Sequence, residues 1–537
     1  MHMKKNIFVK SLLLIGAALL TVSCSKEYLD TASESSESPA TIFETTDNAK
    51  VAINGIARMM TTQYLGSQGM NGEGTIKNWY GNYSGNDAQK CGLTGWALLI
   101  NSNHHENPDS QYLYYPWFYF YKIIGNANSV LANIDGADGP QSERDFIKAQ
   151  ALVYRAYSYM MLVQFYCQRW SDNANDGIPL RLDTSTGDLA KTPTKGVYTQ
   201  IYKDLDEAIQ LFGASGLKRA SSEFYLPDID VAYAVYARAA LNREDWENAA
   251  KYAALARKDH DLMTQKQYMQ SGFSVPNSDW IWGVYDAGDQ TIYYYSYFAY
   301  CGSNSNAGAC RNYPFAISKE LYDQIPETDV RRNLWLAPTA EEMEETYVDK
   351  GDGKTYRCIS RTSGLASAGS LFQRGLALRG NGLTSKLYST SQIYMYMQLK
   401  FQAQDLPGVG SFHLFRAGEM AFIEAEADCH LNRDAQAQKI LEEVNKTFDA
   451  SYSCSKTGAD LLKEVKLYRR IHLWGEGYDW FDYKRWGEPI VRKSIANGGS
   501  WHSTFAITME PAEKNNWTFL IPNRENNYNK LINQFVD

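Results

Sequence analysis

Apolar residues recur at steps of three and four along much of this chain, and that spacing places them on one face of an α-helix. The pattern is clearest over 144–170. Its apolar positions are Ala149, Leu152, Ala156, Tyr159, Val163 and Tyr166. The same spacing predicts further helices over 46–63, 117–134 and 194–211. The pattern therefore indicates a mostly helical protein.

Two pairs of shorter helices are predicted where polar breaks interrupt the apolar pattern. The first pair covers 230–242 and 245–258, and the second covers 415–431 and 434–447. Small and large residues alternate along the first pair, as they do in repeats of the tetratricopeptide type. The alternating residues are Ala232, Ala237, Leu241, Trp246, Ala249, Tyr252 and Ala253. We expect tetratricopeptide-like helical hairpins to form the body of the fold.

Two long segments, 66–116 and 262–413, lack a sustained helical period. The first is rich in Gly and Asn. Within the second, 279–285 is predicted to be a strand, and the Gly- and Ser-rich stretch 360–385 is predicted to be an exposed loop. Long irregular segments in a folded chain are usually functional or disordered, and frequent aromatics argue against disorder. We expect these two segments to build a binding face.

Aromatic side chains are abundant in both irregular segments. The chain contains 38 Tyr, 13 Trp and 21 Phe, an excess typical of proteins that contact flat, hydroxylated ligands. Pyranose rings stack on Trp and Tyr, while nearby Asn, Asp, Gln and Arg can bond their hydroxyls. The candidate ligand-binding residues are Trp79, Tyr80, Trp96, Trp280, Trp282, Tyr293 and Tyr295. Core packing is the alternative for any single ring, and the set as a whole predicts contact with a ligand.

The strand predicted at 279–285 adds a geometric expectation. Trp280 and Trp282 fall on one face of it, with Ile281 between them on the other face. If Ile281 faces the core, both indoles face outward and need a cover or a ligand.

Composition narrows the class of partner. Hydrophobic residues make up 44% of the chain and charged residues 21%, which is typical of a globular protein. The net charge is −8. Binding to nucleic acid needs clustered Lys and Arg, so we expect no nucleic-acid partner.

The eight cysteines form no C-x-x-C pair, which disfavours zinc ribbons and thioredoxin-type redox sites. Cys301 and Cys310 flank a loop of Gly, Ser and Asn. Both a disulfide, in an oxidising compartment, and two unpaired thiols fit this spacing.

Short motifs for catalysis or metal binding are incomplete. Val348 stands where a phosphate loop at 351–355 would need its first Gly, and Ala174 stands where a calcium loop at 172–177 would need an oxygen ligand. Glu424 and Glu426 are two residues apart, so they point to different faces of a helix. We expect no catalytic residues, no metal and no cofactor. A glycoside hydrolase stays open as an alternative, because its two carboxylates need only be brought together by folding.

The first residues have the features of a targeting segment. Lys4 and Lys5 precede an apolar run at 12–20 that is too short to span a bilayer. Ser23-Cys24 follows, and this arrangement resembles a lipobox, where cleavage leaves an acylated Cys24. Thr21 departs from the usual Leu of that motif. We expect residues 1–23 to be a lipoprotein signal peptide and the Ser- and Glu-rich 24–40 to be a flexible tether.

The densest mixture of aromatic and charged residues lies at 467–487. A helix over 460–474, a break at Gly475 and Gly477, and a second helix over 478–486 are predicted there, and we interpret them as a cross-brace for other helices. The stretch resembles a C-terminal signature of the SusD/RagB family, R-R-x-x-L-x-x-E-G-x-R-x-F-D-x-x-R-W-G. The matching residues are Arg469, Arg470, Leu473, Glu476, Gly477, Phe481, Asp482, Arg485, Trp486 and Gly487. Asp479 stands at the second basic position of the pattern.

The resemblance implies an outer-membrane nutrient-binding lipoprotein of Bacteroidetes. Its fold would be mostly helical, with residues 41–537 as a single domain. Its ligand would be a glycan, and its partner would be a TonB-dependent outer-membrane transporter over which it sits as a lid. Anchoring through Cys24 would place it on the cell surface. Binding of a peptide or another non-glycan nutrient in the same lid role is the alternative.

Overall fold

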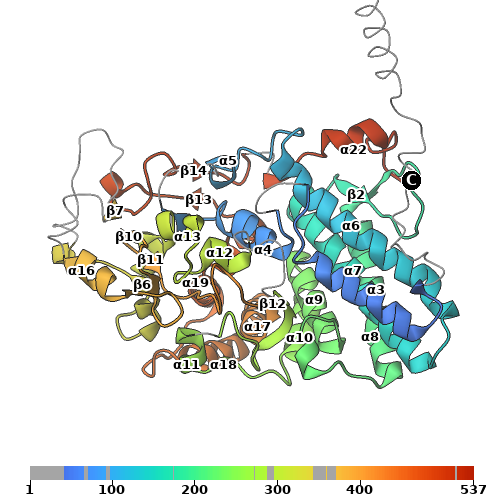
Figure 1. The fold of residues 1–537 in the computed structure, drawn as a ribbon, viewed down its shortest axis with the longest axis horizontal. Coiled ribbons are helices and arrows are strands. Elements are labelled where there is room, and N and C mark those ends of the chain that lie inside the picture. The colour runs from blue at the N-terminus through green and yellow to red at the C-terminus, as the bar shows by residue number, and fades with distance from the viewer. Residues whose placement is uncertain are drawn as a thin grey trace, which may run out of the picture.

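The computed structural model describes residues 42–65, 70–91, 97–172, 174–270, 272–286, 296–342, 358–359, 370–513 and 517–536. Cys24, Trp96, Tyr293 and Tyr295 lie outside these residues, as do the predicted signal peptide, the tether and the 351–355 loop. Figure 1 shows the long helices gathered on one side of the molecule and most of the short strands on the other.

Four long helices form the first part of the helical side. They are α3 (Thr46–Met59), α6 (Gln111–Asn133), α7 (Gln141–Tyr166) and α8 (Thr194–Ser215). Helix α7 packs between α6 and α8, and α3 packs on α6 and α7. The apolar stripe predicted over 144–170 is buried within α7. Periodicity thus identified all four helices.

Two helical hairpins continue the array. Helices α9 (Ile229–Asn242) and α10 (Trp246–Ala256) form the first, and α17 (Ala417–His430) and α18 (Asp434–Asn445) form the second. The carboxylates of Asp228 and Asp245 accept hydrogen bonds from the first-turn amides of α9 and α10, so each helix begins at a capping residue. Helix α17 packs on α10, although a long segment separates the two in sequence. The mostly helical, hairpin-based fold is confirmed.

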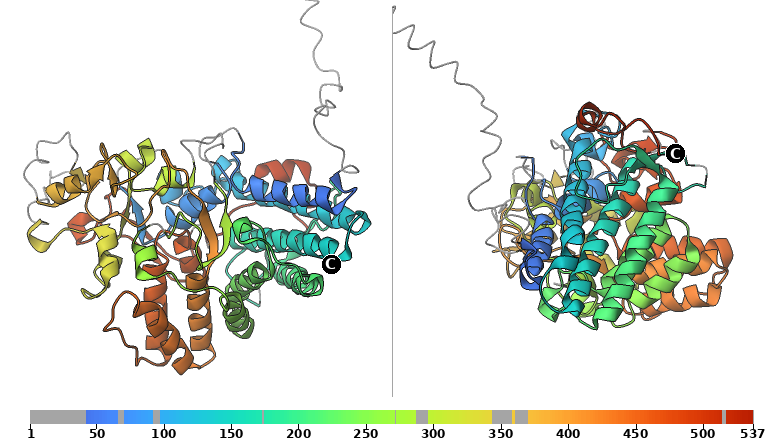
Figure 2. Two further views of the ribbon diagram at one scale, coloured as in Figure 1. Left: turned by 60° about the horizontal axis from the view of Figure 1, so that its bottom comes forward. Right: turned by 90° about the vertical axis from the view of Figure 1, so that its right-hand side faces the viewer.

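Short strands fill the other side of the molecule. The largest sheet has four strands in the order β1 (Ala88–Lys90), β5 (Phe315–Ile317), β11 (Met397–Gln398) and β6 (Trp335–Leu336). A separate antiparallel pair, β4 (Trp280–Val284) with β12 (Phe412–Arg416), leads directly into α17. In the left view of Figure 2 the short yellow and orange elements again lie apart from the long blue and cyan helices. The strand predicted at 279–285 is therefore confirmed.

The expectations for the irregular segments need two corrections. In 66–116 the described residues include a π-helix, η2 (Ile76–Asn82), all of whose residues are buried, and α6 begins within the segment. In 360–385 the described residues begin with helix α16 (Ser370–Ala377), whose Leu371 and Phe372 are buried. Helix η2 shows no helical period because it is buried on all sides, which leaves no polar face to create one.

Helix α6 begins before Pro116 and continues through it, where the sequence suggested a start at Trp117. Pro116 has no N–H and cannot donate to the carbonyl of Tyr112. The hydroxyl of Tyr80 donates to that carbonyl instead, at 2.6 Å. The hydroxyl of Tyr166 donates to the carbonyl of Leu113 at 2.5 Å and accepts from the amide of Trp117 at 2.9 Å. Two tyrosines from η2 and α7 thus replace the helical bonds that the proline opens.

Candidate functional site

The stretch at 467–487 lies where the helical side and the strand side meet. It forms α19 (Gly458–His472) and α20 (Asp479–Trp486), separated by a tight turn in which Gly475 and Gly477 have φ of 75° and 90°. The turn presses against η2: a Cβ added to Gly81 would lie 2.1 Å from the carbonyl oxygen of Gly477. The predicted helix–break–helix is confirmed. The φ values favour glycine in the break, and the close approach requires glycine at position 81 of η2.

Glu476, in that turn, is completely buried among cations. Its carboxylate accepts from Lys400 Nζ at 2.8 Å and from Arg416 Nε at 2.7 Å, and His413 Nε2 lies 2.8 Å away. Burial alone would raise the pKa of Glu476, but the charges of Arg416 and Lys400 outweigh it and hold the pKa well below its usual range. The turn is thereby tied to β12 and to the segment before it.

Further ion pairs connect the same stretch to distant parts of the chain. Arg470 bonds Asp87 through two contacts of 2.7 Å, and Arg485 bonds Glu426 of α17 at 2.6 Å. The side-chain amide of Asn82 donates to the carbonyl of Gly475 at 2.8 Å and accepts from the backbone amide of Gly477 at 3.0 Å. The interpretation of this stretch as a cross-brace agrees with these contacts, since the charged residues of the signature are committed to structural partners.

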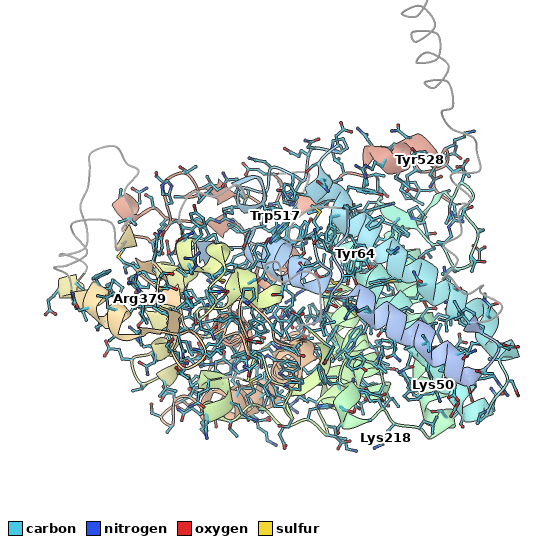
Figure 3. The ribbon with its side chains drawn as sticks, in the orientation of Figure 1. Lys50, Tyr64, Lys218, Arg379, Trp517 and Tyr528 are labelled. Carbon is cyan, nitrogen blue, oxygen red and sulfur yellow. The ribbon has the colours of Figure 1, made fainter. Side chains whose placement is uncertain are left out.

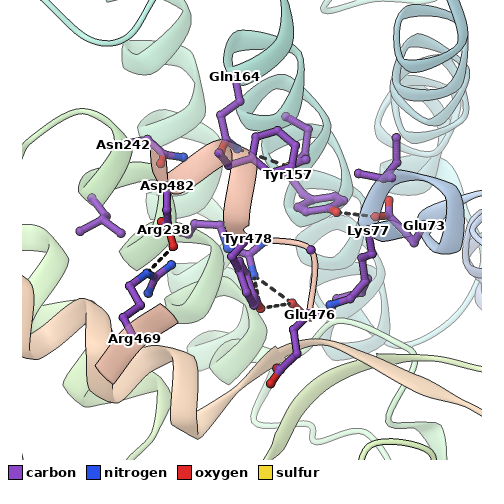
Figure 4. Close-up of a pocket in the computed structure, with 16 residues that line it drawn as sticks. Glu73, Lys77, Tyr157, Gln164, Arg238, Asn242, Arg469, Glu476, Tyr478 and Asp482 are labelled. Carbon is purple, nitrogen blue, oxygen red and sulfur yellow. Dashed lines mark hydrogen bonds and ion pairs between the residues drawn. The ribbon is translucent and has the colours of Figure 1, made fainter. Parts of the chain in front are cut away.

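A cavity lies beside the brace, between α7, α9, α19 and α20 (Figure 4). Glu73 lines it and accepts from the hydroxyls of Tyr119 at 3.0 Å and Tyr157 at 2.8 Å. Burial raises the pKa of Glu73 to about 7. Lys77 lines it too, donates to the carbonyl of His413 at 3.0 Å, and has its pKa lowered by burial to about 8. Burial thus disfavours the charged form of both groups.

The two carboxylates at 424 and 426 are engaged separately. Glu424 bonds Arg257 at 2.7 Å, while Glu426 bonds Arg485 and the indole nitrogen of Trp486 at 2.9 Å. Each carboxylate has its own arginine, and no contact joins the two. Their role in the structure is to fix α10 and α20 against α17.

Four of the predicted ligand-binding aromatics are in the described residues, and all four are buried. Trp79 is 2% exposed, Tyr80 1%, Trp280 3% and Trp282 0%. The expectation that the indoles of Trp280 and Trp282 face outward is wrong. Their side of β4 is covered, because Trp280 packs on Phe224 and Trp282 packs on two tyrosines of α7, Tyr154 and Tyr157.

Hydrogen bonds reinforce this burial. The indole nitrogen of Trp280 donates to the carbonyl of Gly272 at 2.9 Å, and that of Trp282 donates to the carbonyl of Tyr225 at 3.0 Å. A ring that is enclosed and bonded in this way cannot present a face to a sugar in this conformation. Ligand contact by Trp96, Tyr293 and Tyr295 stays a prediction, since the structure does not describe them.

The exposed aromatics lie elsewhere, at positions that sequence reasoning did not select. Tyr285, just after β4, is 50% exposed, and its ring centroid lies 5.7 Å from that of Tyr225 and 6.4 Å from that of Phe224. We call these three residues the surface aromatic cluster. Tyr528, in α22 (Asn523–Tyr528), is 84% exposed and stands at the outer edge of the molecule (Figure 3). The adjacent Phe224-Tyr225 in a polar connection between helices is the one signal in the sequence that could have indicated the cluster.

The structure also shows the surroundings of the two cysteines and of the calcium-loop candidate. Cys301 and Cys310 are both buried free thiols, and Cys310 Sγ donates to the carbonyl of Ala299 at 3.1 Å. Asp176 accepts from the hydroxyl of Thr194 at 2.7 Å. Within the described ranges no cluster of three His, Cys, Asp or Glu side chains is arranged to hold a metal ion. No helix in the described part of the chain is long and apolar enough to cross a membrane.

Two family models match the chain. One, described as "Starch-binding associating with outer membrane", matches residues 27–241, and the model of the SusD family matches residues 250–536. Among curated proteins, the SusD-like protein P2 of Formosa agariphila is 27% identical over 221 residues, which is 40% of this chain and 40% of that protein. The aligned part is thus less than half of that relative's length.

Solved structures share the fold over nearly the whole chain. A SusD-like carbohydrate binding protein from Bacteroides vulgatus matches with a TM-score of 0.71 and 22% identity, over 91% of this chain and 98% of that one. A SusD superfamily protein from Bacteroides thetaiotaomicron matches with a TM-score of 0.67 and 21% identity, over 91% and 99% of the two chains. At these identities the likeness concerns the fold.

Proposed function

The chain belongs to the SusD family, and we propose that it is a cell-surface lipoprotein that captures oligosaccharide and delivers it to a partner TonB-dependent outer-membrane transporter. The observation that carries the proposal is the match of residues 27–241 to a family model of starch-binding proteins that associate with the outer membrane. The structural neighbours described as carbohydrate-binding proteins, from Bacteroides vulgatus and Bacteroides fragilis, support the same ligand class.

The surface aromatic cluster supports a glycan as the ligand. Tyrosine offers a flat apolar face with a polar tip, which suits a ring that has C–H groups on its faces and hydroxyls at its rim. Tyr225 and Tyr285 are inclined at 48° to each other, so together they form a bent surface instead of a flat plate. A bent surface fits a curved oligosaccharide better than a flat surface does. We therefore add Tyr225 and Tyr285 to Trp96, Tyr293 and Tyr295 as candidate contacts.

The partner and the anchor complete the proposal. Cys24 carries the lipid, and residues 24–40 supply a polar tether. A protein held in this way can swing over the mouth of a transporter and back without being lost from the surface. The transport step itself needs no chemistry on the sugar, which agrees with the structural partners found for Glu424 and Glu426.

The test is titration calorimetry of the purified mature protein against a panel of oligosaccharides and a pool of peptides. At least one oligosaccharide should bind. Tyr285→Ala, Trp96→Ala and Tyr293→Ala should each weaken binding where the ring stacks on sugar, by roughly 1–3 kcal/mol by analogy with stacking of bases on aromatic rings. Tyr528→Ala is the matched control, because its ring is exposed but lies outside the cluster. Peptide binding with no glycan binding would overturn the choice of ligand, and release of shorter sugars from a bound oligosaccharide would indicate a hydrolase.

A further inference from the structure

The cavity beside the brace continues into a second hollow, and the two share Gln164, Asn242 and Phe481 in their walls. We call the joined space the crevice. The second hollow lies between the end of α7, α8 and α20, and Arg169, Trp170 and Lys484 line it. The three shared residues are only partly buried and Arg169 is exposed. The crevice therefore has an opening at that end.

Two donors in the crevice have no acceptor. Arg469 is 2% exposed; its Nε donates to Asp482 at 2.7 Å, but its Nη1 has no partner. The Nδ2 of Asn242 is also buried and unpaired. Among the described residues lining the crevice, these are the buried side-chain nitrogen or oxygen atoms that lack a hydrogen bond, and both are donors. Figure 4 shows Asn242 and Arg469 on the same side of the cavity, with Asp482 between them in that view.

Neither of the two cations near the opening, Lys484 and Arg169, is paired directly with a described carboxylate. Lys484 Nζ donates to the backbone carbonyls of Gln164 at 2.6 Å and Cys167 at 2.8 Å, both at the end of α7. Burial lowers the pKa of Lys484 to about 7. No described carboxylate pairs with Arg169 within 4.0 Å. Arg485 is different, since Glu426 and Asp482 both bond it.

An unpaired buried donor is destabilising, and more so when it is charged, so two of them in one space call for an acceptor. A water molecule could accept from both donors, but it would bring two O–H groups that themselves need acceptors. A carboxylate or phosphate oxygen only accepts, and its charge is favoured by Arg169 and Lys484. An oxyanion therefore fits the unmet needs of the crevice better than a neutral group.

We propose that the crevice binds an oxyanion, a carboxylate or a phosphate group, through Arg469 Nη1 and Asn242 Nδ2, with Arg169 and Lys484 supplying the attracting charge. This site is separate from the surface aromatic cluster, and it does not depend on the glycan proposal. Binding would join α9, which carries Asn242, to α19, which carries Arg469. It would therefore stabilise the contact between the helical array and the brace.

The test uses the full mature chain and three probes at matched ionic strength: inorganic phosphate, glucuronate, and glucose as the uncharged control. Titration calorimetry should show binding of phosphate, glucuronate or both, and none of glucose. Binding of one probe alone would identify the oxyanion as phosphate or carboxylate. The melting temperature should rise with the anion that binds, because a ligand of the folded state stabilises it.

Variants assign the binding to the crevice. Asn242→Ala should weaken binding at least about tenfold, as expected for loss of a hydrogen bond to a charged group. Arg169→Gln should weaken it without affecting folding, since the side chain is exposed. Asn126→Ala, at a half-buried position of α6, and Arg58→Gln, at an exposed position of α3, are the matched controls and should bind normally. No binding of either anion, or binding that Asn242→Ala and Arg169→Gln leave unchanged, would overturn the proposal.

Discussion

Glu476 is the residue on which most of the buried charge depends. It is the shared partner of Lys400 and Arg416, with His413 in contact, and all four side chains are almost completely buried. Placing charges in a low-polarity interior is costly unless each is compensated. Removing this one carboxylate would leave two buried cations and an imidazole without their shared partner. Its loss should therefore lower stability more than the loss of an ordinary surface ion pair.

We predict that Glu476→Ala lowers the free energy of unfolding by about 3–5 kcal/mol, the range for removal of one partner from a buried pair. Urea denaturation monitored by tryptophan fluorescence would measure it. Glu488→Ala is the control, because its pair with Lys466 has a carboxylate side chain that is 46% exposed. The control should change stability by less than about 1 kcal/mol. Equal effects of the two substitutions would contradict the central role of Glu476.

The raised pKa of Glu73 predicts that the stability of the protein depends on pH. Its pKa is raised by burial from 4.5 to about 7 in the folded protein, although Tyr157, Tyr119, Lys77 and Arg238 oppose the shift. Between these two values the unfolded chain releases the proton while the folded chain keeps it. The folded state therefore binds more protons in this window, and its stability falls as pH rises from about 4.5 to about 7.

Glu73→Gln should remove that dependence. The expected gain at pH 7 is roughly 3 kcal/mol at most, from a shift of this size. At pH 4 the carboxyl is protonated in both states, so wild type and variant should have similar melting temperatures there. Parallel melting curves for the two proteins across pH 4–8 would show that the carboxyl does not titrate in this window.

At the scale of elements, α6 shows how a helix can tolerate an internal proline. The hydroxyl of Tyr166 satisfies both Leu113 and Trp117, whereas that of Tyr80 satisfies only the carbonyl of Tyr112. Each buried backbone group left without a partner costs roughly 1–3 kcal/mol. We therefore predict that Tyr166→Phe destabilises the protein more than Tyr80→Phe, and that both effects are measurable by thermal unfolding.

Tyr528→Phe is the control for both substitutions. The ring is 84% exposed, so water replaces any bond its hydroxyl makes, and its melting temperature should match that of the wild type. If Tyr166→Phe melts like this control, the hydroxyl does not support the helix. An equal loss of stability in Tyr166→Phe and Tyr80→Phe would contradict the argument that the Tyr166 hydroxyl satisfies two backbone groups and the Tyr80 hydroxyl only one.

The elements that the sequence predicted best include those with one apolar face. Helices α3, α8, α10 and α18 have such a face, and each was recovered within a few residues of its ends. The start of α6 was missed because Pro116, which usually breaks a helix, follows it. Helix η2 was missed because its residues are buried all round, so no period appears. The same reason explains the error at β4, where an alternating pattern normally means one solvent face, but helix α7 and Phe224 cover the second face as well.

The candidate site was harder to predict than the fold. Trp79, Tyr80, Trp280 and Trp282 were selected by residue type, and burial depends on neighbours that come from distant parts of the chain. Conversely, Asn242 and Arg469 are recognised as candidates only once α9 and α19 line the same cavity, because an unpaired donor is a property of the packed structure. The resemblance at 467–487, by contrast, indicated the fold correctly, since the matching residues are those that join its halves.

At the scale of the whole molecule, the brace closes the fold around residues that are far apart in sequence. Asp87, Glu426 and the turn at Glu476 are held together by Arg470, Arg485 and Arg416. Contacts of such long range can form only after most of the chain has been made. The proposed anchor at Cys24 precedes the residues that the structure describes, which begin at residue 42.

The last prediction concerns that anchor. If Cys24 is acylated, each methylene of its chains that enters the bilayer contributes about 0.8 kcal/mol, so removal of the chains should release the protein. Cys24→Ala should therefore appear in the soluble periplasmic fraction, whereas wild type should remain with the outer membrane and be cleaved by protease added to intact cells. Cys454→Ala, at a thiol that is 9% exposed in the folded body, is the control and should stay at the surface. Surface retention of Cys24→Ala would mean that attachment depends on the partner transporter or on another part of the chain, and the lid would then be held by protein contacts alone.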